Sequence, residues 1–527
     1  MSRRSLGRPG LLSLLAGLAA VVAILPLAGV VAAALTGETA AIPARDIARY
    51  AATSGILALL VALATGALGS LAAWLVVMHR FPGRDIFAWA LALPLAAPAF
   101  AVAYAYADLF DVAGDLRMWM RAALGFDLPF EMRTIPGAAF VLTCAFYPYV
   151  YLAMRAAFVN QSAHALEAAR ALGCTPAQAF LRVAMPLARP ALAAGVALAV
   201  METLADYGAV QFLSVQTLTT GVVRAWFVFG SLTSAAQFAL PLLGAAALLL
   251  WIERWGRGGR GYESANARWR PLPVTTLSRP AGVAAGVFCM ALITLGLLLP
   301  AAWLVIAFLP VSPDWPRLIE AGAHSLTLAT AGAVVTVALA TALALGAARV
   351  PHLARLASLG YATPGAVMAI GLLVPAALVW RLAPGAAQGF GAGLIMLIYA
   401  YAARLMAAAL EPIDAGLSRV TPSMVQAARS LGRSPAGAAW SVQLPIARGA
   451  LLTAGLVVFI DILKELPATL ILRPFNFDTL AVIADNYARD ERLAQAGWPA
   501  LLIVLIALPA VIWLTRKIAA SRPGDSA

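Results

Sequence analysis

Long apolar stretches alternate with shorter polar ones along the whole chain of 527 residues. A helix needs about 20 mostly apolar residues to cross a bilayer. Twelve stretches meet this requirement, at about 11–35, 53–78, 86–107, 135–158, 189–206, 236–252, 281–309, 324–346, 356–380, 387–410, 448–470 and 497–515. The alternating ten-residue segments of a membrane β-barrel are absent from the sequence. The pattern therefore predicts an all-α integral membrane protein with about 12 transmembrane helices.

Composition and charge support this prediction and add an orientation. The chain is 62% hydrophobic and only 12% charged, which excludes a soluble domain of this length. If the N-terminus is cytoplasmic, Lys and Arg gather in the segments that face the cytoplasm, as the positive-inside rule requires. The net charge of +13 then reflects topology and contact with anionic lipids of the bilayer, and not a nucleic-acid partner. Both termini are expected in the cytoplasm.

A polar segment occurs twice, 259 residues apart. EAARALGCTPAQAFLRVAMPLARPAL begins at Glu167, and QAARSLGRSPAGAAWSVQLPIARGAL begins at Gln426; 14 of the 26 aligned positions are identical. The repeat divides the chain into a first half, residues 1–252, a basic cytoplasmic linker with six Arg, residues 253–280, and a second half, residues 281–527. Each half holds six spans, so the halves are predicted to be parallel six-helix repeats around an axis along the membrane normal.

Each copy of the segment carries the local signals of a helix, a tight turn and a second helix. Gly173 is a natural helix stop. Thr175 and Gln178 then form a capping-box pattern at the start of the second helix. In the second copy Ser434 repeats the cap, but Gly437 cannot complete the box.

Pro186 and Pro445 are expected to end the second short helix just before the next span. Each loop is thus predicted to lie at the membrane surface as two short helices. A surface hairpin that merely connects two spans is the alternative, and the repetition in register argues against it.

These loops, at residues 160–190 and 412–447, resemble the EAA motif of permease subunits of binding-protein-dependent ABC importers. The matching residues are Glu167, Ala168, Ala169, Gly173, Val183 and Pro186 in the first loop and Ala427, Ala428, Gly432, Val442, Leu444 and Pro445 in the second. Gln426 stands where the motif has Glu, which suggests that the two loops contact their partner differently.

The resemblance implies the type I ABC importer permease fold in a bacterial inner (cytoplasmic) membrane. It also implies that each loop is a coupling helix seated in a cytoplasmic ABC ATPase dimer, and that a periplasmic substrate-binding protein delivers the cargo. The chain has only two lysines, Lys464 and Lys517, and neither follows Gly, so it contains no phosphate-binding GxxxxGK[ST] loop. No cofactor is therefore expected on this chain, and ATP would be hydrolysed by a separate subunit. HExxH and G-x-S-x-G motifs are also absent from the sequence, so an enzyme is not predicted.

Four carboxylates recur at the repeat offset near the predicted outer ends of spans five and eleven. Glu202 matches Asp461 and Asp206 matches Glu465, and each pair is spaced i, i+4 on one helical face. Ionisable groups in or beside spans are costly and usually face a pathway. They are candidates for the translocation path, as a ring that would suit a metal cation, although no residue is firmly assigned as a metal ligand. The alternative is a solvated helix end whose acids are neutralised by neighbours such as Lys464.

The segments that begin at Met201 and Lys464 resemble the matching segments of ferric-iron permeases with two fused halves. Both contain a similar strip, Gln216-Thr217-Leu218 and Asp478-Thr479-Leu480. The resemblance implies an ATP-driven importer of ferric iron. The alternatives are an ABC permease for thiamine or another small solute, and a secondary transporter driven by an ion gradient.

Two further groups of polar side chains lie near predicted span ends. The tyrosines are expected mainly as interfacial anchors: Tyr104, Tyr106, Tyr147, Tyr149 and Tyr151. The acids make the outer loop after span three acidic: Asp108, Asp111, Asp115, Asp127 and Glu131. This loop could dock a binding protein or concentrate cations, and a solvated loop is the alternative.

Overall fold

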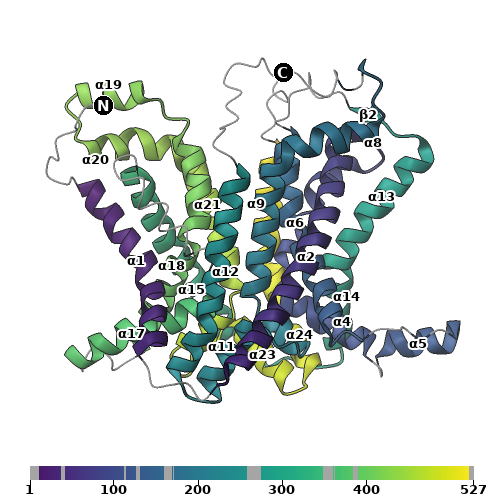
Figure 1. Ribbon diagram of the computed structural model, residues 1–527, viewed down its shortest axis with the longest axis horizontal. Coiled ribbons are helices and arrows are strands. Elements are labelled where there is room, and N and C mark those ends of the chain that lie inside the picture. The colour runs from purple at the N-terminus through teal and green to yellow at the C-terminus, as the bar shows by residue number, and fades with distance from the viewer. Residues whose placement is uncertain are drawn as a thin grey trace. The chain divides into compact units, whose positions relative to one another are not determined.

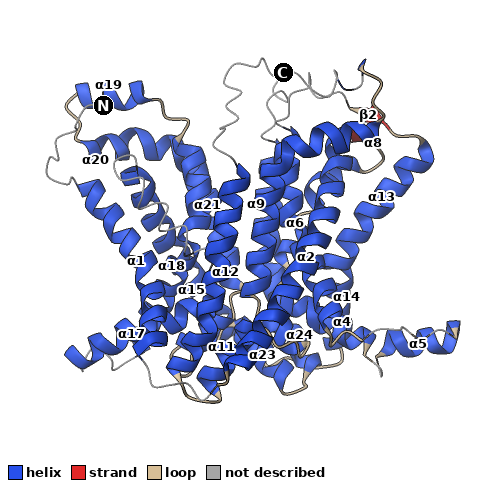
Figure 2. Ribbon diagram, viewed as in Figure 1, coloured by secondary structure: helices blue, strands red, loops and turns tan. Residues whose placement is uncertain are grey.

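The computed structural model describes residues 11–36, 42–111, 114–125, 127, 131–159, 169, 171–257, 274–347, 360, 363–383 and 390–520. Helices form nearly all of the described chain (Figure 2). The chain divides into two compact units. Unit 1 comprises Met1–Ile47, Gly221–Ala246 and Asp314–Ile483, and unit 2 comprises Ala48–Thr220, Ala247–Pro313 and Ala484–Ala527.

Unit 1 is helical in its described part (Figure 1). Its elements are α1 (Leu11–Thr36), α15 (Trp315–Ala347), α17 (Gly365–Leu382), α18 (Phe390–Leu417), α19 (Pro422–Ser430), α20 (Pro435–Ala438), the π turn η5 (Ala439–Gln443), α21 (Leu444–Leu463) and α22 (Pro467–Leu472). A boundary between the units falls within α2 (Ala44–Met78), α11 (Leu218–Phe227), α12 (Leu232–Arg257) and α23 (Leu480–Arg489).

Unit 2 repeats much of this order of elements. Its helices are α3 (Arg84–Ala90), η1 (Leu93–Ala96), α4 (Ala99–Phe110), α5 (Asp115–Leu124), α6 (Ile135–Val159), α8 (Pro176–Ala179), the π turn η2 (Phe180–Ala184), α9 (Met185–Ala205), α10 (Gly208–Phe212), α13 (Arg279–Ile293), the π turn η3 (Thr294–Leu298), α14 (Leu299–Phe308) and α24 (Leu493–Ala520). Two short strands, β1 (His79–Arg80) and β2 (Thr275–Thr276), pair in parallel.

The predicted number of spans is confirmed. Among the described residues, eleven helices are long and apolar enough to cross a membrane, and a bent pair raises the number to twelve. That pair, Arg84–Ala96 and Ala99–Phe110, bends by 89° where a continuous third span was predicted at 86–107. The continuous span was wrong because Ala97 precedes Pro98 and is extended, as residues before proline prefer, so the helix breaks there.

The compact units interleave the two halves of the sequence. In unit 1, α1 packs against α15, α17 and α18 of the second half. Its crossing with α17 is close, because a Cβ on Gly29 would overlap the Gly371 carbonyl and one on Gly371 would overlap the Pro26 carbonyl. In unit 2, α13 to α14 pack among α3, α4, α6 and α24. The halves 1–252 and 281–527 therefore describe the repeat in the sequence, whereas the compact units have other boundaries.

Most of the predicted interfacial tyrosines are core residues instead. Tyr104, Tyr106, Tyr147 and Tyr151 are fully buried in unit 2. The Tyr106 hydroxyl donates to the Leu295 carbonyl at 2.6 Å, and the Tyr151 hydroxyl donates to the Ala88 carbonyl at 2.8 Å. The prediction was wrong for these four residues because their rings are buried in the core of unit 2, where two of the four hydroxyls find backbone acceptors.

Candidate functional site

The first repeated loop closes through a left-handed glycine. Gly173 has φ 82°, and the Cys174 amide donates to the Ala169 carbonyl at 3.0 Å, which is a Schellman closure of the preceding helix. The predicted capping box is confirmed: the Thr175 amide donates to Gln178 Oε1 at 3.0 Å, and the Gln178 amide donates to Thr175 Oγ1 at 3.3 Å. Ala169 is buried. Glu167 and Ala168 lie outside the described residues.

The second loop repeats this geometry at the offset of 259. Gly432 has φ 85°, and the Arg433 amide donates to the Ala428 carbonyl at 3.2 Å. Ser434 Oγ accepts from the Gly437 amide at 3.0 Å, and Gly437 has no side chain to return the bond, as predicted. Ala428 is buried, whereas Gln426 and Ala427 are exposed. The described turns of the two loops thus share one backbone conformation and differ in their caps.

The prolines do not end the second short helix of either loop. Pro186 and Pro445 are the second residues of α9 and α21, and a π turn joins each helix without a break to α8 or α20. The π turn admits one extra residue just before a proline that cannot donate a helical hydrogen bond. Each loop therefore continues directly into a membrane span. Figure 1 shows α19 and α20 at one end of α21.

Aromatic contacts hold the first loop against helices α2 and α6 of the same unit. The ring of Phe180, in the π turn, lies 4.7 Å from that of Trp74 in α2. Trp74 also meets Phe158 of α6 edge-on at 5.6 Å. The second loop has the small, buried Ala439 at the position of Phe180.

Sequence reasoning missed a set of exposed apolar side chains on both loops. Leu172 and Leu431, next to the two glycines, are each 85% exposed. Leu181 is 65% exposed, and Trp440, at the same repeat position, is 77% exposed. Large apolar side chains that are exposed at equivalent places in two loops indicate an interaction surface. The recurrence of large apolar residues at the same positions of an otherwise polar repeat could have indicated this surface in the sequence.

Glu465 acts as a helix cap inside unit 1. Its Oε1 accepts from the Ala468 amide at 3.0 Å and its Oε2 from the Thr469 amide at 3.1 Å, in the first turn of α22. Arg404 Nη1 lies 3.7 Å from its Oε1, and the carboxylate is buried. The charge of Glu465 is therefore balanced by a helix N-terminus and a guanidinium.

The matching residue of unit 2 has the same local role. Asp206 Oδ1 accepts from the Val210 amide at 3.0 Å, in the first turn of α10. Asp461 forms an ion pair with Lys464 at 3.1 Å, and Glu202 lies half-buried in the last turn of α9. Glu202 and Asp206 belong to unit 2, whereas Asp461 and Glu465 belong to unit 1, so the ring of four carboxylates remains a prediction.

Equivalent hydrogen bonds fix the strips that follow the short helices. The Leu218 amide donates to Ser54 Oγ at 2.9 Å in unit 2, and the Leu480 amide donates to Ser325 Oγ at 2.9 Å in unit 1. The turns before these strips also match, because Ser214 and Asn476 both have a positive φ, near 60°. The resemblance between the two strips in the sequence is thus reproduced in their local contacts.

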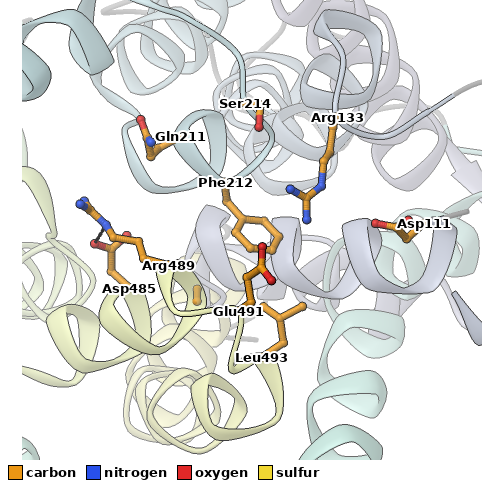
Figure 3. A pocket seen from close by; sticks show the side chains of 10 residues that line it. Asp111, Arg133, Gln211, Phe212, Ser214, Asp485, Arg489, Glu491 and Leu493 are labelled. Atoms are coloured by element: carbon orange, nitrogen blue, oxygen red, sulfur yellow. Dashed lines mark ion pairs between the residues drawn. The ribbon is translucent and has the colours of Figure 1, made fainter. Parts of the chain in front are cut away.

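A polar pocket of about 490 Å³ lies within unit 2 (Figure 3). Its charged lining consists of Asp111, Arg133, Asp485, Arg489 and Glu491. Arg489 pairs with Asp485 at 2.7 Å and also donates a hydrogen bond to the Tyr207 hydroxyl. The described residues contain no group of three or more His, Cys, Asp or Glu side chains that could hold a metal ion.

Comparison with known proteins assigns the family. The model of the family described as "Binding-protein-dependent transport system inner membrane component" matches residues 65–255. The sulfate transport system permease protein CysT of Escherichia coli is 31% identical over 210 residues, which cover 39% of this chain and 74% of that protein. The chain belongs to this family. It is a transport permease of the ABC importer class and not an enzyme.

Two other relatives of this permease differ in what their names say they transport. The Fe(3+)-transport system permease protein FbpB 2 of Haemophilus influenzae is 26% identical over 480 residues, which cover 88% of this chain and 89% of that protein. The putative 2-aminoethylphosphonate transport system permease protein PhnU of Salmonella typhimurium is 28% identical over 155 residues, which cover 29% of this chain and 54% of that protein.

Proposed function

We propose that this permease imports ferric iron across a bacterial inner membrane, driven by ATP hydrolysis in a separate ATPase dimer and supplied by a periplasmic binding protein. Both termini and both repeated loops would face the cytoplasm. The alternative of a secondary transporter is set aside, because the relatives of this chain are permeases of ABC importers.

The repeated loops support coupling to an ATPase. Each is held by a left-handed glycine and a cap, and each continues into a span without a break, so force on the loop would pass directly to a transmembrane helix. The exposed Leu172, Leu181, Leu431 and Trp440 supply an apolar surface that a partner would cover. Glu167, Ala168, Ala169, Gly173 and Pro186, with Gln426, Ala427, Ala428, Gly432 and Pro445, are the proposed coupling residues.

The proposal of iron as the cargo rests on how much of this chain one relative covers. The match to the Fe(3+) permease covers nearly the whole of both chains, including both halves, whereas the match to the sulfate permease covers 39% of this chain. The latter is 31% identical, so an oxyanion is the second candidate cargo. Glu202, Asp206, Asp461 and Glu465 are proposed to line the route, with Asp206 and Glu465 also holding the short helices at its edge.

In the proposed cycle, ATP binding closes the ATPase dimer and draws the two loops together, which opens the permease outward to receive cargo. Hydrolysis resets the inward-open state. Carboxylates that are balanced by neighbours, as Glu465 is by Arg404 and Asp461 is by Lys464, would let a cation pass without trapping it.

Uptake measurements in cells distinguish between the candidate cargoes. Labelled ferric iron, sulfate and thiamine are offered to cells with and without this chain, and with its ATPase present or deleted. Loss of iron uptake alone in both deletions supports the proposal. Loss of sulfate or thiamine uptake instead keeps the importer and overturns the iron cargo. Uptake that persists without any ATPase overturns the coupling.

A further inference from the structure

Helix α5 departs from the direction of its neighbours in unit 2. It follows the end of α4 and extends sideways, across the direction of α13 and α14 (Figure 1). The sequence predicted only an acidic outer loop here. The structure instead has a ten-residue helix, Asp115–Leu124, whose side chains are mostly apolar.

The polar stripe of α5 is bound by the chain itself. Arg117 Nε lies 2.7 Å from Asp127 Oδ1, and Arg121 Nη2 lies 2.8 Å from Asp127 Oδ2. The two arginines are spaced i, i+4 and so share one side of the helix. The hydrogen bond from Arg117, and to a smaller extent the one from Arg121, holds the pKa of the Asp127 carboxyl well below its usual range. Asp127 is therefore a carboxylate at neutral pH and forms an ion pair with each arginine.

The opposite side of α5 is exposed and apolar. Trp119 is two residues from each arginine, which places it on the other side of a helix with 3.6 residues per turn. It is 58% exposed, and Ala122 and Ala123, three and four residues further along the same side, are also exposed. Exposed tryptophan is enriched at protein interfaces and at the membrane–water boundary, so this face is a candidate contact surface.

The ends of α4 and α14 indicate that lipid covers this face. Trp303 Nε1 of α14 donates to Asp108 Oδ2 at the end of α4, at 2.8 Å, and so ties the end of a membrane span to the start of this region. Ile306 and Leu309, at that end of α14, are 69% and 70% exposed, as side chains that face lipid are. Helix α4 packs against both α5 and α14, so α5 lies near this exposed apolar surface.

We propose that α5 is an interfacial helix that lies in the bilayer surface at the predicted outer end of unit 2, with Trp119 at the boundary between lipid headgroups and acyl chains. Such helices bury their apolar face about 5–10 Å into this boundary, and tryptophan is enriched there. The contacts of Asp127 orient the helix by holding its arginine stripe on the side away from the acyl chains. The loop then acts as a lateral anchor in lipid rather than as a solvated acidic segment.

Site-specific labelling tests this placement. Trp119→Cys and, as the matched control, Glu131→Cys are each labelled with an environment-sensitive fluorophore. The background carries Cys174→Ser, and the buried Cys144 and Cys289 are retained. The full permease is reconstituted in phosphatidylethanolamine and phosphatidylglycerol vesicles with or without nitroxide-labelled lipid. Only labelled samples that elute as a single species are measured.

We expect a blue-shifted emission at position 119 and quenching by nitroxide lipid about threefold stronger than at position 131, as for a helix at the acyl boundary. Equal quenching at the two positions would overturn the proposal. A label at position 119 that is water-exposed in vesicles, and shifts only when the binding protein is added, would also overturn it and would assign this face to protein docking.

Discussion

The left-handed glycines of the two loops allow a clean test of coupling. Gly173 and Gly432 have φ values of 82° and 85°, where residues with a Cβ are strained. A Cβ added at either position meets no atom of the described residues within 4 Å. Replacement by Ala therefore introduces backbone strain without a steric clash, and any effect reports the turn itself.

The strain can be given a magnitude. The left-handed region costs an L-residue about 1–2 kcal/mol relative to glycine, which corresponds to about a 5- to 30-fold lower population of the native turn. Gly173→Ala should weaken binding of the ATPase by at most this factor. Gly173→Asn should weaken it less, because Asn tolerates this region, and Gly173→Val should weaken it more, because a β-branched residue does not.

Binding of the purified ATPase to permease in lipid nanodiscs measures this series, and coupled transport gives a second readout. Gly173→Asp separates strain from charge, since Asp also tolerates the left-handed region. The reasoning is refuted if Val, Ala and Asn variants bind equally well. It is also refuted if Asp alone abolishes binding, because the surface charge and not the turn would then matter. The same series at Gly432 should give the same order.

Three further predictions concern packing, caps and buried charge. Gly371→Leu should destabilise unit 1 by about 1–3 kcal/mol, because the side chain meets the Pro26 carbonyl, and thermal unfolding in detergent measures this. Gln178→Ala should remove the acceptor of the Thr175 amide and cost the loop about 1 kcal/mol, visible as faster hydrogen exchange at that amide. Glu465→Ala should cost about 3–5 kcal/mol, because it removes a buried carboxylate that faces Arg404 and caps α22, and chemical denaturation measures this.

Matched variants complete these tests. Gly322→Leu places the same side chain in a helix with open space and should be nearly neutral, so equal losses at 322 and 371 would contradict the packing argument. Gln178→Glu should preserve protection of the loop amide, because it keeps an acceptor. Glu465→Gln also keeps an acceptor for the amides of α22 and should lose less stability than Glu465→Ala. If Glu465→Gln and Glu465→Ala lose the same amount of stability, the hydrogen bonds to the amides of α22 do not contribute to stability.

Features encoded over a few residues could be predicted from the sequence. The spans follow from apolar runs of sufficient length, and the capping box of Thr175 and Gln178 follows from local hydrogen-bonding chemistry. The left-handed turn at Gly173 follows from the freedom of glycine. The repeat of 259 residues also predicted which loop residues would share one conformation.

Features that depend on tertiary packing could not be predicted. The placement of α1 among helices of the second half depends on the close approach at Gly29 and Gly371, which are ordinary helical glycines in the sequence. Glu465 was proposed for the route from its spacing alone, and its contact with Arg404 is distant in the chain. The break before Pro98 could have been recognised from the proline, but the hydropathy of the segment concealed it.

Reconstituted transport tests the central claim most directly. The permease is incorporated in proteoliposomes with its ATPase inside and its binding protein outside, and uptake of labelled ferric iron and of labelled sulfate is measured with and without ATP. We predict ATP-dependent iron uptake that requires both proteins and is lost in the Gly173→Val, Gly432→Val double variant. Iron uptake that is unaffected by ATP or by the double variant, or uptake of sulfate in place of iron, would contradict the account.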